Sequence, residues 1–162
     1  GGEFGHIVID ASLKETCPCG KKGHLEAYAS GTGIARIARA ESIRVKDSRL
    51  NEIVPAELTA TDIGQCARDG DRLAITIIDQ AGRCLGLGLG TLMTLYNPQV
   101  IILGGGVWEG IGDLLLPTVN SAIEETLLDE ELYSCPLVKA ELGEGVGLWG
   151  AAYAAAKQFL SF

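Results

Sequence analysis

The sequence predicts an α/β fold, because short apolar runs typical of strands alternate with longer segments of helical pattern. Residues 100–103 form a continuously apolar run of the kind found in strands buried on both faces. This run leads into three glycines and a further helical segment, and residues 72–96 upstream read as one long helix. The 162 residues fit a single domain.

The first predicted elements are a short strand and a helical segment. Residues 7–9 are a short β-branched run and are expected to form a strand. Residues 25–40 offer an apolar face suited to a helix, which the segment 30–33 either bends or breaks into two helices. The Gly-x-Gly in this segment is by itself a weak sign of phosphate binding, so a structural role is favoured.

The middle of the chain is predicted to contain two helices. Residues 41–57 are polar and less periodic, which suggests a surface connection. Thr59 or Thr61 is expected to cap a helix that begins near Asp62. A turn then leads into the long helix over residues 72–96.

Three glycines recur every four residues in the long helix, at Gly82, Gly86 and Gly90. This spacing puts them on one face and permits close approach of a neighbouring backbone. In a membrane such a stripe favours helix dimerisation. Charged residues share the segment, so we expect a tight contact with a sheet or another helix instead. Asn-Pro at residues 97–98 ends the helix.

The last third of the chain is expected to contain a helix, a strand and a closing helix. The helix is predicted over residues 113–128, and the strand within residues 135–142. A glycine-rich turn at residues 143–147 leads to an alanine-rich helix over residues 148–162. Its small residues suit close packing: Gly150, Ala151, Ala154 and Ala155.

The first 26 residues concentrate side chains that bind metals. His6, Cys17, Cys19 and His24 form a Cys2His2 set, which suits a closed tetrahedral zinc site. The glycines between them let the loop turn back, so that His24 reaches the same ion. The spacing is not that of a zinc finger, and the alternative is a flexible thiol loop that could oxidise.

Composition excludes several classes of protein. The formal charge of −8 argues against a nucleic-acid-binding surface, which is normally basic. The sequence shows neither a membrane-spanning run nor the charged start of a signal peptide. The five cysteines do not form a disulfide framework; Cys66, Cys84 and Cys135 read as reduced thiols, which indicates a cytoplasmic protein.

Two runs near the start carry a resemblance to a known family. GEFGH at residues 2–6 and CPCGKKGHLEAYASG at residues 17–31 are similar to the signature of the ROK family of repressors, open reading frames and sugar kinases. The similarity continues more loosely through IILGGGV at residues 101–107 to the terminal helix. One position departs: the family usually has a third cysteine where this chain has His24, although imidazole is also a competent zinc ligand.

The resemblance implies a hexose site beside the metal. Residues like Glu3, His6 and Glu26 hydrogen-bond the hydroxyls of a hexose in this family, and carboxylates accept such bonds strongly. His6 would then serve both as zinc ligand and as sugar contact, and the zinc would hold the loop rather than activate water. Read without the resemblance, Glu3 and Glu26 are ordinary solvent-exposed charges.

The resemblance also implies the C-terminal lobe of an actin-like (ribonuclease H-like) ATPase. Residues 1–31 would carry the zinc and sugar loop, and residues 32–162 the helical, nucleotide-side segment, with the N-terminal lobe absent. Gly105 and Gly106 would lie against the adenosine of the nucleotide, in a strand–glycine–helix arrangement suited to it. No Walker-type phosphate loop is present, so a P-loop enzyme is excluded.

The implied activity is that of an ATP-dependent hexose kinase, closest to the glucokinase branch, which uses ATP with magnesium. The general base would belong to the absent lobe, and Asp10 has no matching context, so no catalytic residue is assigned. Two alternatives remain: the hexose-sensing part of a ROK repressor, and a zinc-stabilised assembly domain without a small-molecule site. Glucose and N-acetylhexosamines all fit the carboxylates, and a homodimer is expected.

Overall fold

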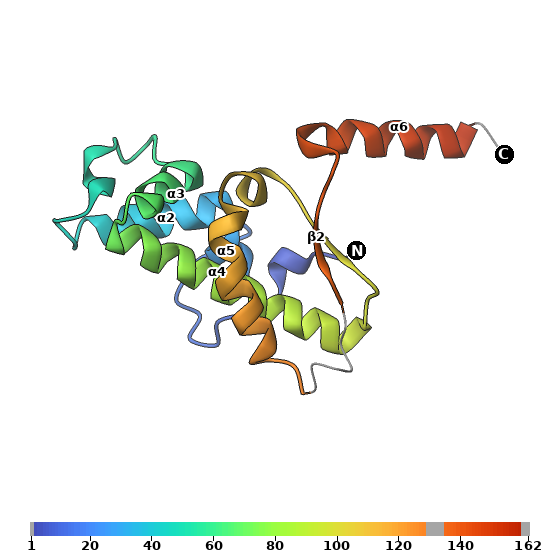
Figure 1. Cartoon of the computed structure of the whole chain (residues 1–162), viewed down its shortest axis with the longest axis horizontal. Coiled ribbons are helices and arrows are strands. Elements are labelled where there is room, and N and C mark those ends of the chain that lie inside the picture. The colour runs from blue at the N-terminus through green and yellow to red at the C-terminus, as the bar shows by residue number, and fades with distance from the viewer. Residues whose placement is uncertain (1, 129–134, 160–162) are drawn as a thin grey trace.

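Four helices build the core of the chain in the computed structural model, which describes residues 2–128 and 135–159. They pack together in the body of the molecule, with two short strands at one side and the last helix extending away from it (Figure 1). The four helices are α2 (Gly31–Ser42), α3 (Ala60–Arg68), α4 (Arg72–Tyr96) and α5 (Gly106–Glu124).

The long helix α4 has the bounds that the sequence predicts. The carboxylate of Asp71 accepts a hydrogen bond of 2.9 Å from the backbone N–H of Ala74, which satisfies a free donor of the first turn. At the other end Asn97 adopts the left-handed conformation, with φ of 41°, and closes the helix before the proline. The prediction for residues 72–96 is confirmed.

The glycine stripe of α4 lies against α5. A Cβ atom on Gly86 would lie 2.5 Å from the carbonyl oxygen of Val119 and 2.6 Å from the Cβ of Ala122. A Cβ on Gly82 would come within 3.1 Å of Thr118, and one on Gly90 within 2.7 Å of Thr126. The close contact predicted from the spacing is therefore made, and its partner is a helix.

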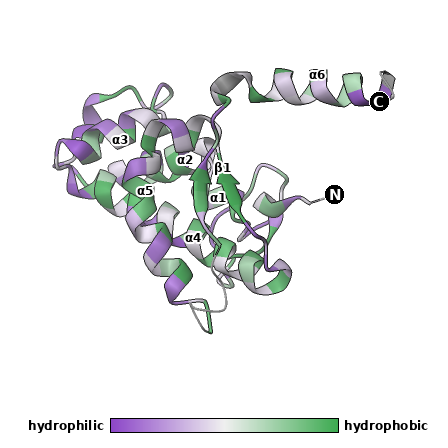
Figure 2. Ribbon diagram, turned by 45° about the vertical axis from the view of Figure 1, so that its right-hand side comes forward, coloured by the Kyte–Doolittle hydropathy of each residue, from purple (hydrophilic) through white to green (hydrophobic). Residues whose placement is uncertain are grey.

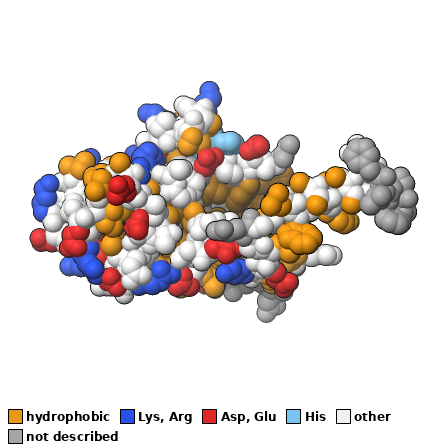
Figure 3. Space-filling model, turned by 90° about the horizontal axis from the view of Figure 1, so that it is seen from above, with side chains coloured by type: hydrophobic (Ala, Val, Ile, Leu, Met, Phe, Trp, Pro, Cys, Tyr) orange, Lys and Arg blue, Asp and Glu red, His pale blue; other side chains and the backbone are white. Residues whose placement is uncertain are grey.

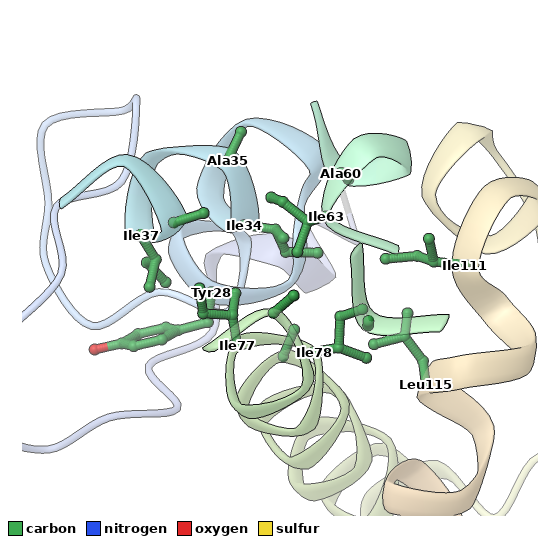
Figure 4. Close-up of a cluster of buried hydrophobic side chains, with 14 of the residues drawn as sticks. Tyr28, Ile34, Ala35, Ile37, Ala60, Ile63, Ile77, Ile78, Ile111 and Leu115 are labelled. Atoms are coloured by element: carbon green, nitrogen blue, oxygen red, sulfur yellow. The ribbon is translucent and has the colours of Figure 1, made fainter. Parts of the chain in front are cut away.

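Branched side chains from all four helices meet in one cluster (Figure 4). Ile34 from α2, Ile63 from α3, and Ile111 and Leu115 from α5 are at most 2 % exposed. Tyr28 contributes its ring at the edge of this cluster, and its hydroxyl points away from the other labelled side chains (Figure 4). Burial of this apolar surface is the main contribution to the stability of the helical body.

The helical segment near residue 30 is broken in two. α1 spans Glu26–Ala29, and the Ser30 hydroxyl then accepts a 3.0 Å hydrogen bond from Gly33 N–H as the cap of α2. The predicted cap of α3 is Thr59, which forms a reciprocal capping box with Asp62. The surface connection between α2 and α3 contains one short 3-10 turn, η2 (Arg49–Glu52).

One predicted strand is absent, and both predicted ends of one helix are wrong. Residues 7–9 do not form a strand: η1 (Phe4–His6) precedes them and a turn follows, so only Val8 forms an isolated bridge, to His24. Helix α5 begins at Gly106 rather than at residue 113, and it ends at Glu124. The early start is possible because Gly112 packs its backbone against Trp108, where a Cβ would lie 2.9 Å from the ring.

The two strands form a parallel pair, β1 (Ile101–Leu103) with β2 (Leu137–Lys139) (Figure 2). In the register Ile102 faces Val138 across the ladder. The strand near residue 101 was expected to be buried on both faces, but Ile102 is 64 % exposed. The described residues supply only these two strands, and one face of the pair has no covering layer among them.

The last helix, α6 (Val146–Phe159), follows the 3-10 turn η3 (Gly143–Gly145) and projects from the body. Its small residues, expected to pack closely, are exposed, and hydrophobic side chains gather on its surface (Figure 3). The remainder of the predicted helix, residues 160–162, and residues 129–134 lie outside the described residues. Among the described helices, none has the length and apolar character needed to cross a membrane.

Candidate functional site

The candidate site is built around residues 10–24, which we call the metal loop. Cys17 N–H donates to Lys21 O at 2.8 Å and Gly20 N–H to Cys17 O at 2.9 Å, so the chain reverses tightly between the two cysteines and His24. Gly20 and Gly23 have φ of 85° and 75°, a region that favours glycine. The glycines thus perform the turning role that the sequence predicts for them.

The structure brings the four predicted metal ligands together. One ligand atom from each of His6, Cys17, Cys19 and His24 lies within 4.8 Å of all the others. The Cys19 Sγ and His24 Nδ1 atoms are 3.3 Å apart. A tetrahedral zinc with bonds of about 2.0–2.3 Å needs ligand atoms roughly 3.3–3.8 Å apart, so a small contraction of the longest edge is enough. The donor set and its spacing therefore fit a zinc ion.

The four candidate ligands differ in exposure. The Cys17 side chain is buried, and burial raises the pKa of its thiol. Cys19 is exposed, and the two histidines are half-buried with ring centroids 5.3 Å apart. The cluster is therefore anchored in the protein at Cys17 and open to solvent at Cys19.

The predicted sugar-binding residues also meet. His6 lies between two carboxylates: its Nδ1 is 3.4 Å from Glu3 Oε2, and its Nε2 is 3.2 Å from Glu26 Oε2. Glu26 Oε2 is in turn 4.0 Å from the Cys17 Sγ atom, which joins this group to the candidate ligands. The Glu3 side chain is 79 % exposed and that of Glu26 35 %, so both can accept hydrogen bonds from a polyhydroxy ligand.

A second candidate site is a cavity of about 530 Å³ where three helices begin. Its lining comes mainly from the first turns of α2, α3 and α5 and the residues just before α3: Gly31, Thr32, Ala35, Arg39, Leu58, Thr59, Ala60, Thr61, Gly106 and Val107. Each helix N-terminus carries partial positive charge and free N–H groups, so their convergence suits an anionic ligand.

Of the two predicted nucleotide glycines, Gly106 lines this cavity and Gly105 caps α5 with φ of 91°. Apart from the adjacent residues and the backbone of the same helix, no atom of the described residues lies within 4 Å of the position that a Cβ would take on either of them, so a ligand can approach the backbone there. Sequence reasoning missed Thr32 and the Thr59–Thr61 segment. The Gly-x-Gly at residues 31–33 held a usable signal, but nothing in the sequence indicated that it meets Gly106.

With this geometry in place, comparison with known proteins identifies the family. The ROK family model matches residues 1–158. The chain belongs to the ROK family.

Relatives of this ROK chain include both enzymes and regulators. It is 34 % identical to a glucokinase of Halalkalibacterium halodurans over 97 % of this chain and 48 % of the enzyme. It is 33 % identical to the DNA-binding transcriptional dual regulator NagC of Escherichia coli over 87 % of this chain and 34 % of the regulator. The chain therefore spans about half the length of the first relative and a third of the second.

Solved structures agree with the α/β assignment. A ROK family glucokinase from Streptomyces griseus, solved in complex with glucose and AMPPNP, superimposes with a TM-score of 0.74. The identity is 30 %, over 94 % of this chain and 50 % of that one. The overall fold of this ROK chain is thus similar to part of a sugar kinase.

Asp10 is occupied by structural contacts in this ROK chain. Its carboxylate accepts hydrogen bonds from the Ser12 and Tyr28 hydroxyls and from backbone N–H groups, and these bonds lower its pKa. Burial and the bond to Asp10 raise the pKa of the Tyr28 hydroxyl. A carboxylate held in this way is a poor proton acceptor.

Proposed function

We propose that this chain is the C-terminal lobe of an actin-like, ATP-dependent hexose kinase of the glucokinase type. The whole protein would transfer the γ-phosphoryl group of magnesium-bound ATP to a sugar hydroxyl. The N-terminal lobe would supply the general base that accepts the proton of that hydroxyl. Location in the cytoplasm and assembly as a homodimer stay predictions.

The sugar side of the proposal rests on Glu3, His6 and Glu26. These three groups, capable of charge-assisted or strong hydrogen bonds, lie beside the other three candidate metal ligands. The zinc would be held by His6, Cys17, Cys19 and His24 and would fix the loop from which the sugar is contacted. The role of the protein groups is to bind and orient the hydroxyls, which places the reacting oxygen for transfer.

The observation that carries the assignment as a kinase is the cavity at the three helix N-termini. A sensor of sugar needs only the hexose site, whereas a kinase also needs a place for an anionic nucleotide. The cavity is lined by the first turns of three helices, whose N-termini carry partial positive charge, and by the open backbone of Gly106. Gly31 of this cavity follows Glu26 by only five residues, so the short helix α1 connects the two sites.

The similarity to NagC favours a second candidate, the hexose-sensing part of a ROK repressor. Such a protein binds sugar without phosphorylating it. The third possibility, a zinc-stabilised assembly domain, predicts that neither Glu3→Gln nor Glu26→Gln changes hexose affinity.

The test is sugar-dependent ADP release by the longer protein that contains this chain. We expect release with glucose or an N-acetylhexosamine, and no turnover by the 162 residues alone. Gly106→Val should raise the KM for ATP at least about tenfold because the side chain would enter the cavity, whereas Gly147→Val on exposed α6 serves as the matched control. Hexose binding without ADP release would favour the repressor, and turnover by the isolated chain would refute the proposed division between lobes.

A further inference from the structure

The Tyr28 hydroxyl closes a ring of hydrogen bonds around the residue that precedes His24. It donates to the Asp10 carboxylate and accepts a 3.3 Å bond from the backbone N–H of Glu15. Asp10 N–H in turn donates to Gly23 O at 3.2 Å, and Gly23 N–H donates to Glu15 O at 2.9 Å. Both backbone polar groups of Gly23 thus bond to the two residues that the Tyr28 hydroxyl joins, and the Gly23 carbonyl also accepts a 2.8 Å bond from Ile9 N–H.

Gly23 is tightly enclosed in this ring. Its φ is 75°, and a Cβ on it would lie 2.5 Å from the carbonyl oxygen of Asp10. His24 follows directly, and Cys17 lies two residues beyond Glu15. A movement of Asp10 or Glu15 would therefore shift Gly23 and the adjacent candidate ligand His24, and a movement of Glu15 would also shift Cys17.

A second contact ties the ring to the helical body. Arg36 of α2 forms an ion pair with Glu15 through one guanidinium nitrogen, and its other terminal nitrogen donates to the carbonyl of Ala27 at 3.0 Å. The Glu15 side chain is only 15 % exposed whereas that of Arg36 is 40 % exposed, so the pair is sheltered on the Glu15 side alone. Tyr28 is 3 % exposed, with its ring in the core and its hydroxyl turned toward the loop (Figure 4).

We infer that Tyr28 and Arg36 are positioning residues, which hold the metal loop in the geometry that brings His24 and Cys17 to the same ion. The inference rests on the proposed function, in which this loop holds zinc and the hexose. The hydrogen bonds of the Tyr28 hydroxyl go to Asp10 and Glu15 rather than to a candidate ligand, so it acts through these residues and Gly23. A buried ring is a rigid anchor, because its hydroxyl can move only if the core moves.

The test begins with Tyr28→Phe, which removes the hydroxyl and keeps the ring. We expect zinc affinity, measured by competition with a chelator, to fall roughly tenfold, in the range found for outer-sphere partners of metal ligands. Hydrogen exchange at the Gly23 amide should rise roughly tenfold, while exchange in the middle of α4 stays unchanged. Tyr96→Phe, on an exposed tyrosine at the end of α4, should change neither quantity.

Three further substitutions test whether Tyr28 acts through Asp10 and whether Arg36 acts through Glu15. In the Tyr28→Phe background, Asp10→Ala should weaken zinc binding less than it does in the parent chain, because the bond between the two residues is already gone. Arg36→Met should loosen Gly23, and Arg36→Lys should restore part of the protection by keeping the charge pair with Glu15.

Unchanged exchange at Gly23 in Tyr28→Phe would overturn the inference. An equal rise in exchange at Gly23 and in α4 would also overturn it, since the hydroxyl would then act on global stability alone. The exchange measurement does not depend on metal. If the parent chain binds no zinc, the proposed metal site fails while the result at Gly23 still decides the positioning role.

Discussion

In the metal loop, the fold is held by hydrogen bonds, turns and candidate metal ligands, whereas at the glycine stripe α4 and α5 are held mainly by close packing of the α4 backbone against the backbone and small side chains of α5. A hydrogen bond from Thr118 to Asp79 and the Arg83–Glu125 ion pair flank this packing. Gly23 shows the first case, with both backbone groups bonded within the loop. Gly86 shows the second, with the α5 backbone so close that a Cβ would reach 2.5 Å from a carbonyl oxygen.

Both regions depend on glycine, but for different physical reasons. Gly20 and Gly23 supply positive φ angles that other residues adopt at a cost, so they shape the chain locally. Gly82, Gly86 and Gly90 have helical angles and supply room for a partner. The loop should therefore respond to loss of metal and the helix pair to added volume, and each region should be insensitive to the other change.

The largest expected effect is at a metal ligand. Cys17→Ser should weaken zinc binding by more than about 100-fold, because it removes a buried thiolate from a four-ligand set. Zinc content and chelator competition measure this loss. Far-ultraviolet circular dichroism should change little, since Cys17 is one small member of an apolar core that residues 27–123 mostly build. Loss of helical signal on removal of zinc would show that the helical body depends on the metal loop, contrary to the proposed difference between the two regions.

Added volume between α4 and α5 should have the next largest effect. Gly86→Ala should reduce the free energy of unfolding by about 2 kcal/mol, because overpacking outweighs the better helix propensity of alanine. Urea unfolding measures the loss. Gly150→Ala, on the exposed face of α6, is the control and should be neutral or stabilise by up to about 1 kcal/mol. Similar results for the two variants would show that the contact is loose.

The cap of α4 should give a smaller effect that depends on pH. Burial opposes ionisation of Asp71, but bonds from Ala74 N–H, Arg49 N–H and the Ser48 hydroxyl outweigh it and lower the pKa. A lowered pKa in the folded state stabilises the protein above the unfolded pKa of about 3.9 and loses this contribution as pH falls below it.

Asp71→Asn should therefore cost about 1–2 kcal/mol at pH 7, and the difference from the parent chain should shrink below about pH 4. Urea unfolding at several pH values measures it. The exposed Asp47→Asn is the control and should follow the parent chain throughout. A cost that stays constant down to pH 2 would show that the charge of Asp71 is not involved.

The features predictable from sequence were those encoded locally. Asp71 and Asn97 mark the two ends of α4, and Thr59 caps α3. The spacing of Gly82, Gly86 and Gly90 predicts a closely packed neighbour. The spatial cluster of the four candidate metal ligands was also predictable, because the cysteines and histidines are concentrated within 26 residues; that they bind zinc stays a prediction.

The features missed were those set by distant contacts. Glycines at 110 and 112 argue against a helix locally, yet α5 runs through both, because Thr61 and Trp108 pack where side chains would otherwise stand. The exposure of Ile102 depends on how many strands join its sheet. The N-termini of three helices meet at the cavity and bring together residues more than 70 positions apart in the sequence. No local sequence pattern predicts this contact.

The exposed surface of α6 has a consequence for the behaviour of this chain in solution. Three large hydrophobic side chains of α6 are exposed: Leu148 at 81 %, Trp149 at 66 % and Tyr153 at 70 %. Such a hydrophobic surface favours association. The formal charge of −8 opposes self-association at low salt. At an ionic strength of 0.1 M this repulsion is screened beyond about 10 Å. Raising the ionic strength should therefore lower the protein concentration at which the isolated chain begins to self-associate.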